Sequence, residues 1–132
     1  MLKGLLYKIL FISWIVFVTF SSLFSFKGVQ MGSFAFNVPH VDKLVHFIFY
    51  FIMVILGFLA LRNDFKHRFS LKRTLLWIVL FSIIYGIIIE VLQYTITVDR
   101  QGDILDALAN SLGAFMGLLL VKSTKYRDGS LK

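Results

Sequence analysis

The chain contains no cysteine, only one proline and few charged residues. Without cysteine it forms neither disulfides nor thiolate metal sites. Charged residues make up 16% of the chain, compared with about 25% in soluble domains. The single proline, Pro39, lies in a segment that we predict to be a loop, Lys27 to Val41. These absences argue against both a disulfide-stabilised domain and an ordinary soluble globule.

The chain is instead rich in apolar residues. They make up 58% of its 132 residues, and the mean hydropathy is +0.83. A soluble protein of this size has too little interior to bury so much apolar surface, so the composition indicates an integral membrane protein. The net charge of +7 does not indicate nucleic-acid binding, because the aromatic residues lie in the apolar runs and not among the basic residues. The partner that this composition predicts is the lipid bilayer.

Four long runs carry little or no charge, and a helix across a bilayer needs about 20 residues. We predict spans at about residues 9–26, 44–61, 75–94 and 104–121. Because these runs are continuous rather than alternating, they favour helices over a β-barrel. The predicted fold is an all-α four-helix transmembrane bundle. It forms a single domain over residues 1–132 and ends in a basic tail at 122–132.

The first run, Ile9 to Phe26, has a second interpretation. Lys3 and Lys8 before it are typical of the basic start of a secretory signal peptide. Its 18 residues exceed a signal core of about 7–15 residues, and no A-x-A cleavage site follows. We therefore expect a retained first span.

Lysine and arginine are distributed unevenly across this topology. With both termini on one side, eleven of the fourteen lie on that side, and three, Lys27, Lys43 and Arg100, lie on the other. Cytoplasmic segments of membrane proteins carry an excess of Lys and Arg. We therefore predict that both termini are cytoplasmic.

Polar residues gather at the predicted outward ends of three spans. Residues three or four apart share one face of a helix, and this spacing forms three stripes. They are Asp42, His46 and Tyr50 on the second span; Ser82, Gly86, Glu90 and Gln93 on the third; and Asp103, Asp106, Asn110, Gly113 and Gly117 on the fourth. The glycines and Ser82 are expected to allow close helix packing. The other members, with Arg100 from the turn, are expected to form one outward-facing ligand-binding site.

Two interpretations of these polar residues remain open. As structural groups, Asp42 and Asp103 would be helix N-caps, and the others would hydrogen-bond between helices. Glu90 argues for a function, because an acid inside a span is costly unless it is paired or used. The candidates for catalytic groups are His46, Glu90 and Asp106, with the imidazole as a proton carrier. No reaction is assigned.

The ordered set of motifs resembles the VanZ-like membrane proteins of bacteria. It consists of Asp42-Lys43-Leu44-Val45-His46-Phe47 with Tyr50, then Glu90-Val91-Leu92-Gln93, Arg100, Asp103, Asp106, Asn110 and Gly113. The resemblance covers residues 39–117 and implies a multi-pass protein of the bacterial cytoplasmic membrane. The namesake of the family is associated with low-level resistance to the glycopeptide teicoplanin. This chain has Val98-Asp99 where many members have Pro-Gly before the arginine.

The predicted site suits more than one function. It would bind or process the headgroup of an envelope lipid or glycolipid, with Arg100 holding a phosphate and Gln93 and Asn110 bonding sugar or amide groups. Alternatively, Glu90 and His46 would relay protons in an ion-coupled transporter, which with four helices per chain would need a homo-oligomer. In a third alternative, the polar groups only hold the bundle or a partner in place.

A metalloenzyme is a further alternative. Asp42, His46, Glu90 and Asp106 offer the oxygen and nitrogen ligands that bind a divalent cation. The sequence has no HExxH motif or equivalent. We therefore expect no metal and no cofactor.

Overall fold

The computed structural model describes residues 1–24, 41–96, 103–127 and 129. These residues form four α-helices: α1 (Leu2–Leu23), α2 (Val41–Phe65), α3 (Leu71–Ile96) and α4 (Ile104–Arg127). All four are long and apolar enough to cross a membrane. In hydrocarbon a helix satisfies its backbone groups internally, so continuous apolar runs favour this structure. The prediction of an all-α bundle of four transmembrane helices is confirmed.

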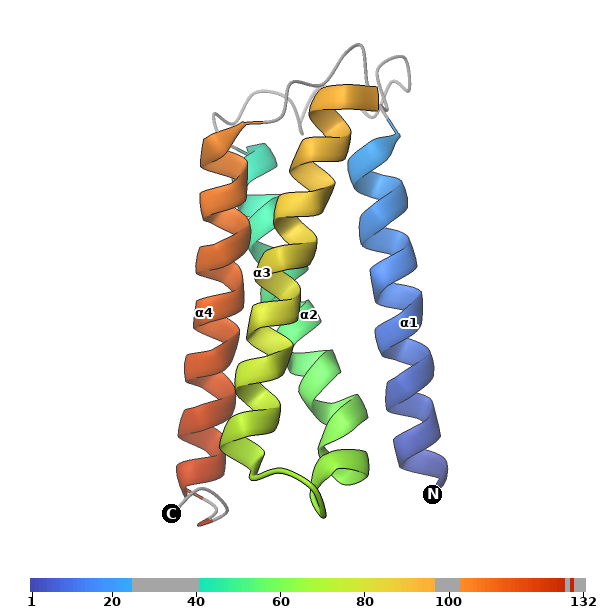
Figure 1. Cartoon of the computed structure of the whole chain (residues 1–132), viewed down its shortest axis with the longest axis vertical. Helices are drawn as coiled ribbons and strands as arrows, with labels where there is room; N and C mark the ends of the chain where they lie inside the picture. Colours follow the sequence, from blue (N-terminus) through green and yellow to red (C-terminus); the bar gives the residue numbers. More distant parts are fainter. Residues whose placement is uncertain (25–40, 97–102, 128, 130–132) are drawn as a thin grey trace.

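The four helices lie side by side and alternate in direction (Figure 1). The first turn of α1, the last turn of α4 and the turn between α2 and α3 lie at one end of the bundle, which we call the terminal end. The last turns of α1 and α3 and the first turns of α2 and α4 lie at the opposite end, which we call the far end. Helix α2 packs against each of the other three, whereas α1 and α4 make no contact over their described residues.

The helices are longer than the predicted spans at several ends. α1 begins at Leu2, and α4 continues to Arg127, so the first part of the predicted basic tail is helical. The segment between the second and third predicted spans is shorter than expected, because α2 ends at Phe65 and α3 begins at Leu71. Hydropathy marks only the part of a helix that lies in hydrocarbon, and backbone hydrogen bonding extends the helix into the interface.

Helices α2 and α4 pack through glycines, and their backbones approach closely. A Cβ atom at Gly113 would overlap the carbonyl oxygen of Phe47, and one at Gly117 would lie 3.0 Å from the carbonyl oxygen of Phe51. Residues without a side chain allow this approach. The predicted GxxxG stripe therefore lies in the interface between α2 and α4.

Helix α1 is attached to α2 and α3 by aromatic and polar side chains. The ring of Phe49 packs edge-on against the rings of Trp14 and Phe17, with centroids 5.9 and 5.6 Å apart. The indole Nε1 of Trp14 donates a hydrogen bond to the carbonyl oxygen of Phe49 at 2.9 Å. The hydroxyls of Thr19 and Tyr85 are hydrogen-bonded to each other. Such directional contacts fix one helix against another where lipid makes burial of apolar surface a weak driving force.

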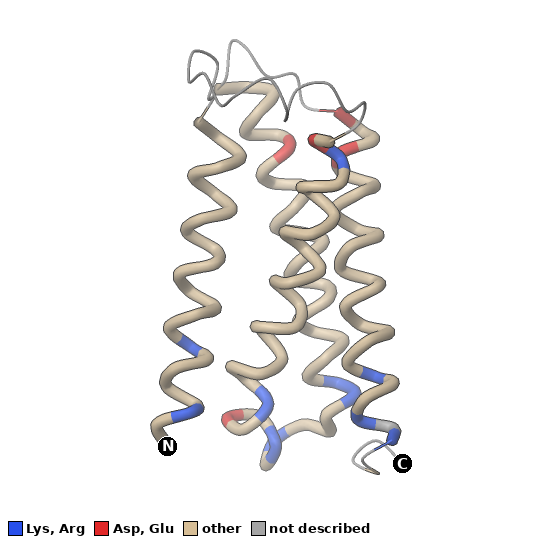
Figure 2. The backbone as a smooth tube through the Cα atoms, turned by 180° about the vertical axis from the view of Figure 1, so that it is seen from behind, with Lys and Arg blue, Asp and Glu red and all other residues tan. Residues whose placement is uncertain are grey.

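The two ends of the bundle differ in charge (Figure 2). Among the described residues, Lys and Arg gather at the terminal end, and Lys43 alone lies at the far end. Four described acids lie at the far end: Asp42, Glu90, Asp103 and Asp106. The middle of the bundle is filled by an apolar core that includes Val18, Met53, Val54, Phe58 and Ile78.

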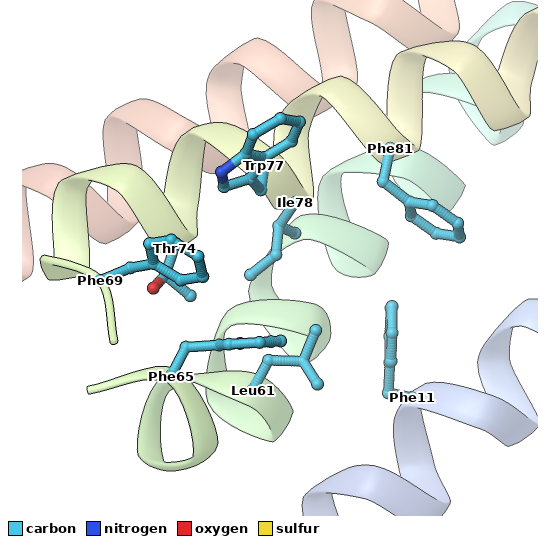
Figure 3. A pocket seen from close by; sticks show the side chains of 8 residues that line it. All are labelled: Phe11, Leu61, Phe65, Phe69, Thr74, Trp77, Ile78 and Phe81. Carbon is cyan, nitrogen blue, oxygen red and sulfur yellow. The ribbon is translucent and has the colours of Figure 1, made fainter. Parts of the chain in front are cut away.

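A hollow of about 390 Å³ opens between α1, α2 and α3 near the terminal end (Figure 3). Its lining is apolar except for one hydroxyl and one indole nitrogen: Phe11, Leu61, Phe65, Phe69, Thr74, Trp77, Ile78 and Phe81. A lining of this kind suits the hydrocarbon chains of the bilayer and offers no acid, base or nucleophile of useful reactivity. The candidate chemistry lies at the far end.

Candidate functional site

Five polar side chains from three helices meet at the far end of the bundle. They form a group that we call the polar cluster: Lys43 and His46 from α2, Glu90 from α3, and Asp106 and Asn110 from α4. Four of the five are buried, and the relative exposures of His46, Glu90 and Asn110 are 7%, 7% and 1%. Charged and polar groups at this depth are costly unless they are paired. The contacts inside the cluster therefore determine how far that cost is offset.

The amide of Asn110 links the imidazole to one carboxylate. Its Nδ2 donates to Oε1 of Glu90 at 3.3 Å, and its Oδ1 lies 3.0 Å from Nδ1 of His46. An ionised carboxylate only accepts hydrogen bonds, so the amide NH₂ faces Glu90 and the amide oxygen faces the imidazole. Nδ1 of His46 is then the protonated nitrogen that donates to the amide. In the neutral imidazole this leaves Nε2 with a free lone pair.

The second buried carboxylate faces that lone pair. Oδ2 of Asp106 lies 3.9 Å from Nε2 of His46, which is too long for a hydrogen bond. The other oxygen, Oδ1, accepts a hydrogen bond from Nζ of Lys43 at 3.2 Å. In Glu90, too, the two carboxylate oxygens differ. Oε1 accepts a hydrogen bond from Asn110, while Oε2 is buried without a hydrogen-bond partner among the described residues.

Lys43 is the described cation of the cluster, and three carboxylates share it. Its ammonium lies 3.3 Å from Oδ2 of Asp103 and 3.5 Å from Oδ2 of Asp42, in addition to its bond with Asp106. Asp103 also accepts a hydrogen bond from the backbone N–H of Leu105 at 2.9 Å, in the first turn of α4. This hydrogen bond, and then Lys43, lower the pKa of Asp103 below its ordinary value. Asp103 is therefore ionised near neutral pH, and it caps α4 as well as binding Lys43.

The remaining predicted site residues lie around or outside the cluster. Asp42 is in the first turn of α2, not at its N-cap, and its side chain is 62% exposed. Tyr50 is fully buried one turn below His46, and its hydroxyl has no hydrogen-bond partner among the described residues. Gln93 donates through Nε2 to the carbonyl oxygen of Ser22 at 2.7 Å, which ties α3 to α1. Arg100 lies outside the described residues.

The small and hydroxyl residues of the third predicted span also face inward. Ser82 is fully buried, and its hydroxyl donates to the carbonyl oxygen of Ile78 in its own helix. Gly86 lies against Tyr50 and Asn110, so a Cβ there would lie 3.1 Å from the tyrosine ring and 3.2 Å from Cβ of the asparagine. The packing around Gly86 therefore supports the floor of the polar cluster.

Lys43 was not predicted to be a site residue from the sequence. The signal was present, because Lys43 precedes His46 by three residues and so lies on the same face of α2. Position alone did not show that its long side chain reaches across to α4 rather than outward to water. The α1 groups that hold the bundle together, Trp14 and Thr19, were also not identified.

A hollow of about 240 Å³ between α3 and α4 borders the polar cluster. Its lining includes Glu90 and Asp103 together with apolar residues of both helices: Ile87, Val91, Tyr94, Ile104 and Ala107. Several of these apolar side chains are exposed on the outside of the bundle, where a membrane protein meets lipid. The hollow therefore connects the lipid-facing surface with the edge of the cluster.

A comparison with protein families matches the family model described as VanZ/LLP1 to residues 4–125, which is nearly the whole chain. Searches of curated proteins and of solved structures find no match. The match includes α2, α3, nearly all of α1 and α4, and every residue of the polar cluster.

Proposed function

The chain belongs to the VanZ/LLP1 family of membrane proteins, and from this premise we propose that its polar cluster binds the headgroup of an envelope lipid or glycolipid. The observation that carries the proposal is the buried network of His46, Asn110 and Glu90, which lies beside a hollow open to the lipid-facing surface. A lipid in the membrane reaches such a site laterally, with its chains along α3 and α4 and its headgroup at the far end.

The charge of the cluster favours a ligand rich in hydrogen-bond donors. The four described acids at the far end outnumber Lys43, the described cation there, and that ammonium already binds three carboxylates. Carboxylates accept hydrogen bonds from hydroxyl and amino groups, whereas they repel a bare phosphate. Sugar hydroxyls and amines therefore suit the described groups directly. A phosphate on the same lipid would need the cation Arg100 or a bound metal ion.

A continuous ion path through a single chain is less well supported. Below the polar cluster the interior consists of the apolar core, with residues such as Met53, Val54 and Phe58 fully or almost fully buried. Proton relays use chains of ionisable or hydroxyl groups. Below the cluster the described ranges bury the hydroxyls of Tyr50, Ser82 and Thr74, but no further acid or histidine continues the path. A site open at one end fits binding or processing better than transport.

We propose that the far end faces outward from a bacterial cytoplasmic membrane, because cytoplasmic segments are enriched in Lys and Arg. The test is the reactivity of single cysteines, since the chain has none of its own. In intact cells, Ile96→Cys at the end of α3 should react with an impermeant thiol reagent, and Lys66→Cys in the turn after α2 should react only after lysis. The opposite pattern would reverse the orientation and place the cluster on the cytoplasmic side.

Bound lipid tests the proposed ligand directly. Native mass spectrometry of the purified protein should show a retained envelope lipid or glycolipid, and Glu90→Gln should lose most of it. Glutamine keeps the shape of the side chain and removes its charge, so folding should survive. The matched control is Asp64→Asn, which removes an exposed acid paired with Lys8 at the terminal end. Equal lipid retention by the wild type and Glu90→Gln would contradict the proposal.

The same pair of variants tests the link to glycopeptide tolerance. If headgroup binding underlies tolerance, cells producing Glu90→Gln should become as sensitive to teicoplanin as cells without the protein, while Asp64→Asn should behave as wild type. Tolerance retained by Glu90→Gln after its lipid is lost would separate the two functions.

A further inference from the structure

We infer that the polar cluster holds a divalent transition-metal ion between His46, Glu90 and Asp106. One potential ligand atom from each of the three lies within 4.8 Å of the other two. The three residues come from three different helices and are all buried. All three are among the four residues that the sequence offers as ligands for a divalent cation, and the fold brings these three together.

Each of the three side chains has one atom held by the protein and one that is not. Asn110 holds Nδ1 of His46 and Oε1 of Glu90. Lys43 holds Oδ1 of Asp106. The second atoms are Nε2 of His46 and Oδ2 of Asp106, which face each other at 3.9 Å, and Oε2 of Glu90, which is buried without a hydrogen-bond partner among the described residues.

Metal ligands in proteins show the same arrangement, in which one atom of the side chain is hydrogen-bonded to the protein and another binds the metal. A ligating histidine donates its other ring N–H to a protein oxygen, which fixes the tautomer and directs the free lone pair at the metal. Two acceptors that face each other at 3.9 Å repel when both lack a proton, and a cation between them removes the repulsion. A buried polar atom without a partner likewise calls for an ion or a water.

The charge of the site also favours a cation. Glu90 and Asp106 are 7% and 8% exposed. Oε1 of Glu90 lies 3.4 Å from Nδ1 of His46, and Oδ2 of Asp106 lies 3.9 Å from Nε2. Lys43 contacts only Asp106 of this pair and is shared with Asp42 and Asp103. A divalent ion would balance the two buried carboxylates. One nitrogen and two carboxylate oxygens suit ions such as Zn²⁺ or Mn²⁺.

The proposed metal site has three protein ligands, one fewer than the four that the sequence offered. Asp42 does not belong to it, since its side chain is largely exposed and pairs with Lys43. The absence of an HExxH motif excluded only a site built on one helix, whereas this set combines three helices. The role of this cation rests on the proposed function and extends it. A bound cation would allow the acid-rich cluster to bind a phosphate of the lipid headgroup.

The experiment measures Zn²⁺ and Mn²⁺ bound to the purified full-length chain, by equilibrium dialysis and elemental analysis without any lipid ligand. We expect one ion per wild-type chain and a rise in melting temperature on adding the metal. His46→Gln and Glu90→Gln should each weaken metal binding by about 100-fold or more, above the 10–100-fold typical of residues that only orient ligands. The matched controls His67→Gln and Asp64→Asn change an exposed histidine and an exposed acid and should bind as wild type does.

Two results would overturn the metal site. One is a folded wild-type chain that binds neither ion in a stoichiometric amount. The other is equal binding by wild type, His46→Gln and Glu90→Gln, which would place the metal elsewhere. A metal-free wild type that still retains lipid would leave the proposed headgroup binding intact. A metal-loaded wild type without lipid would remove the proposed function and leave the metal site.

Discussion

Gly113→Ala should lose most of its folded protein, although it adds only one methyl group. A Cβ at this position overlaps the carbonyl oxygen of Phe47 in the backbone of α2, which no rotamer change can relieve. The two helices must separate, and the glycine contacts between them are lost. Overpacking typically costs about 1–3 kcal/mol, and we expect the upper end of that range because the clash is with backbone. Folded yield in detergent and the apparent melting temperature measure the effect.

Alanine substitutions at two other glycines provide comparisons for the expected loss of stability. Gly117→Ala should be milder, because its Cβ would lie 3.0 Å from the nearest atoms of Phe51 and Val54. Gly4→Ala is the matched control, since the added methyl group would meet no atom within 4 Å outside its own turn of helix, and alanine is the better helix former by about 1 kcal/mol. If Gly113→Ala melts at the same temperature as Gly4→Ala, the two helices do not pack as closely as described.

Asn110→Leu should be the most damaging single change within the polar cluster. Leucine has a similar volume, so the change removes hydrogen bonds rather than packing. It removes the amide that lies between Nδ1–H of His46 and Oε1 of Glu90, both in buried positions. These two atoms lie 3.4 Å apart and can contact each other directly, so the loss should be about that of one buried unsatisfied group, roughly 1–3 kcal/mol. The measurement is the melting temperature, with metal and lipid content recorded on any folded fraction.

The control for this change lies on α2 at the terminal end. Asn63→Leu makes the same substitution at an exposed position and should leave the melting temperature nearly unchanged. The double variant Asn110→Leu with Glu90→Leu tests the cause, because it removes the acceptor together with its donor. It should be less damaging than the sum of the two single changes. Strict additivity would mean that the amide and the carboxylate do not depend on each other.

The sequence by itself determined the class of protein and the positions of its helices. Continuous apolar runs of about 20 residues have few alternatives to a transmembrane helix, so four helices followed directly from composition. Spacing by three and four residues also placed His46, Glu90, Asp106 and Asn110 on inward faces, because helical periodicity is local. The glycine stripe of α4 could be recognised for the same reason.

Only the tertiary structure decided which of these side chains meet. Periodicity fixes the face of a residue but not the helix that it faces or the atoms that come together, because those depend on how helices far apart in sequence pack. Gln93 shared a stripe with Glu90, yet it bonds α1 instead of entering the cluster. Lys43 is central because its flexible side chain reaches across to Asp103 and Asp106 on α4. Asn110 and Lys43 each hydrogen-bond to the proposed metal ligands and leave a second atom of each ligand for the metal. These bonds form only when α2, α3 and α4 are packed together.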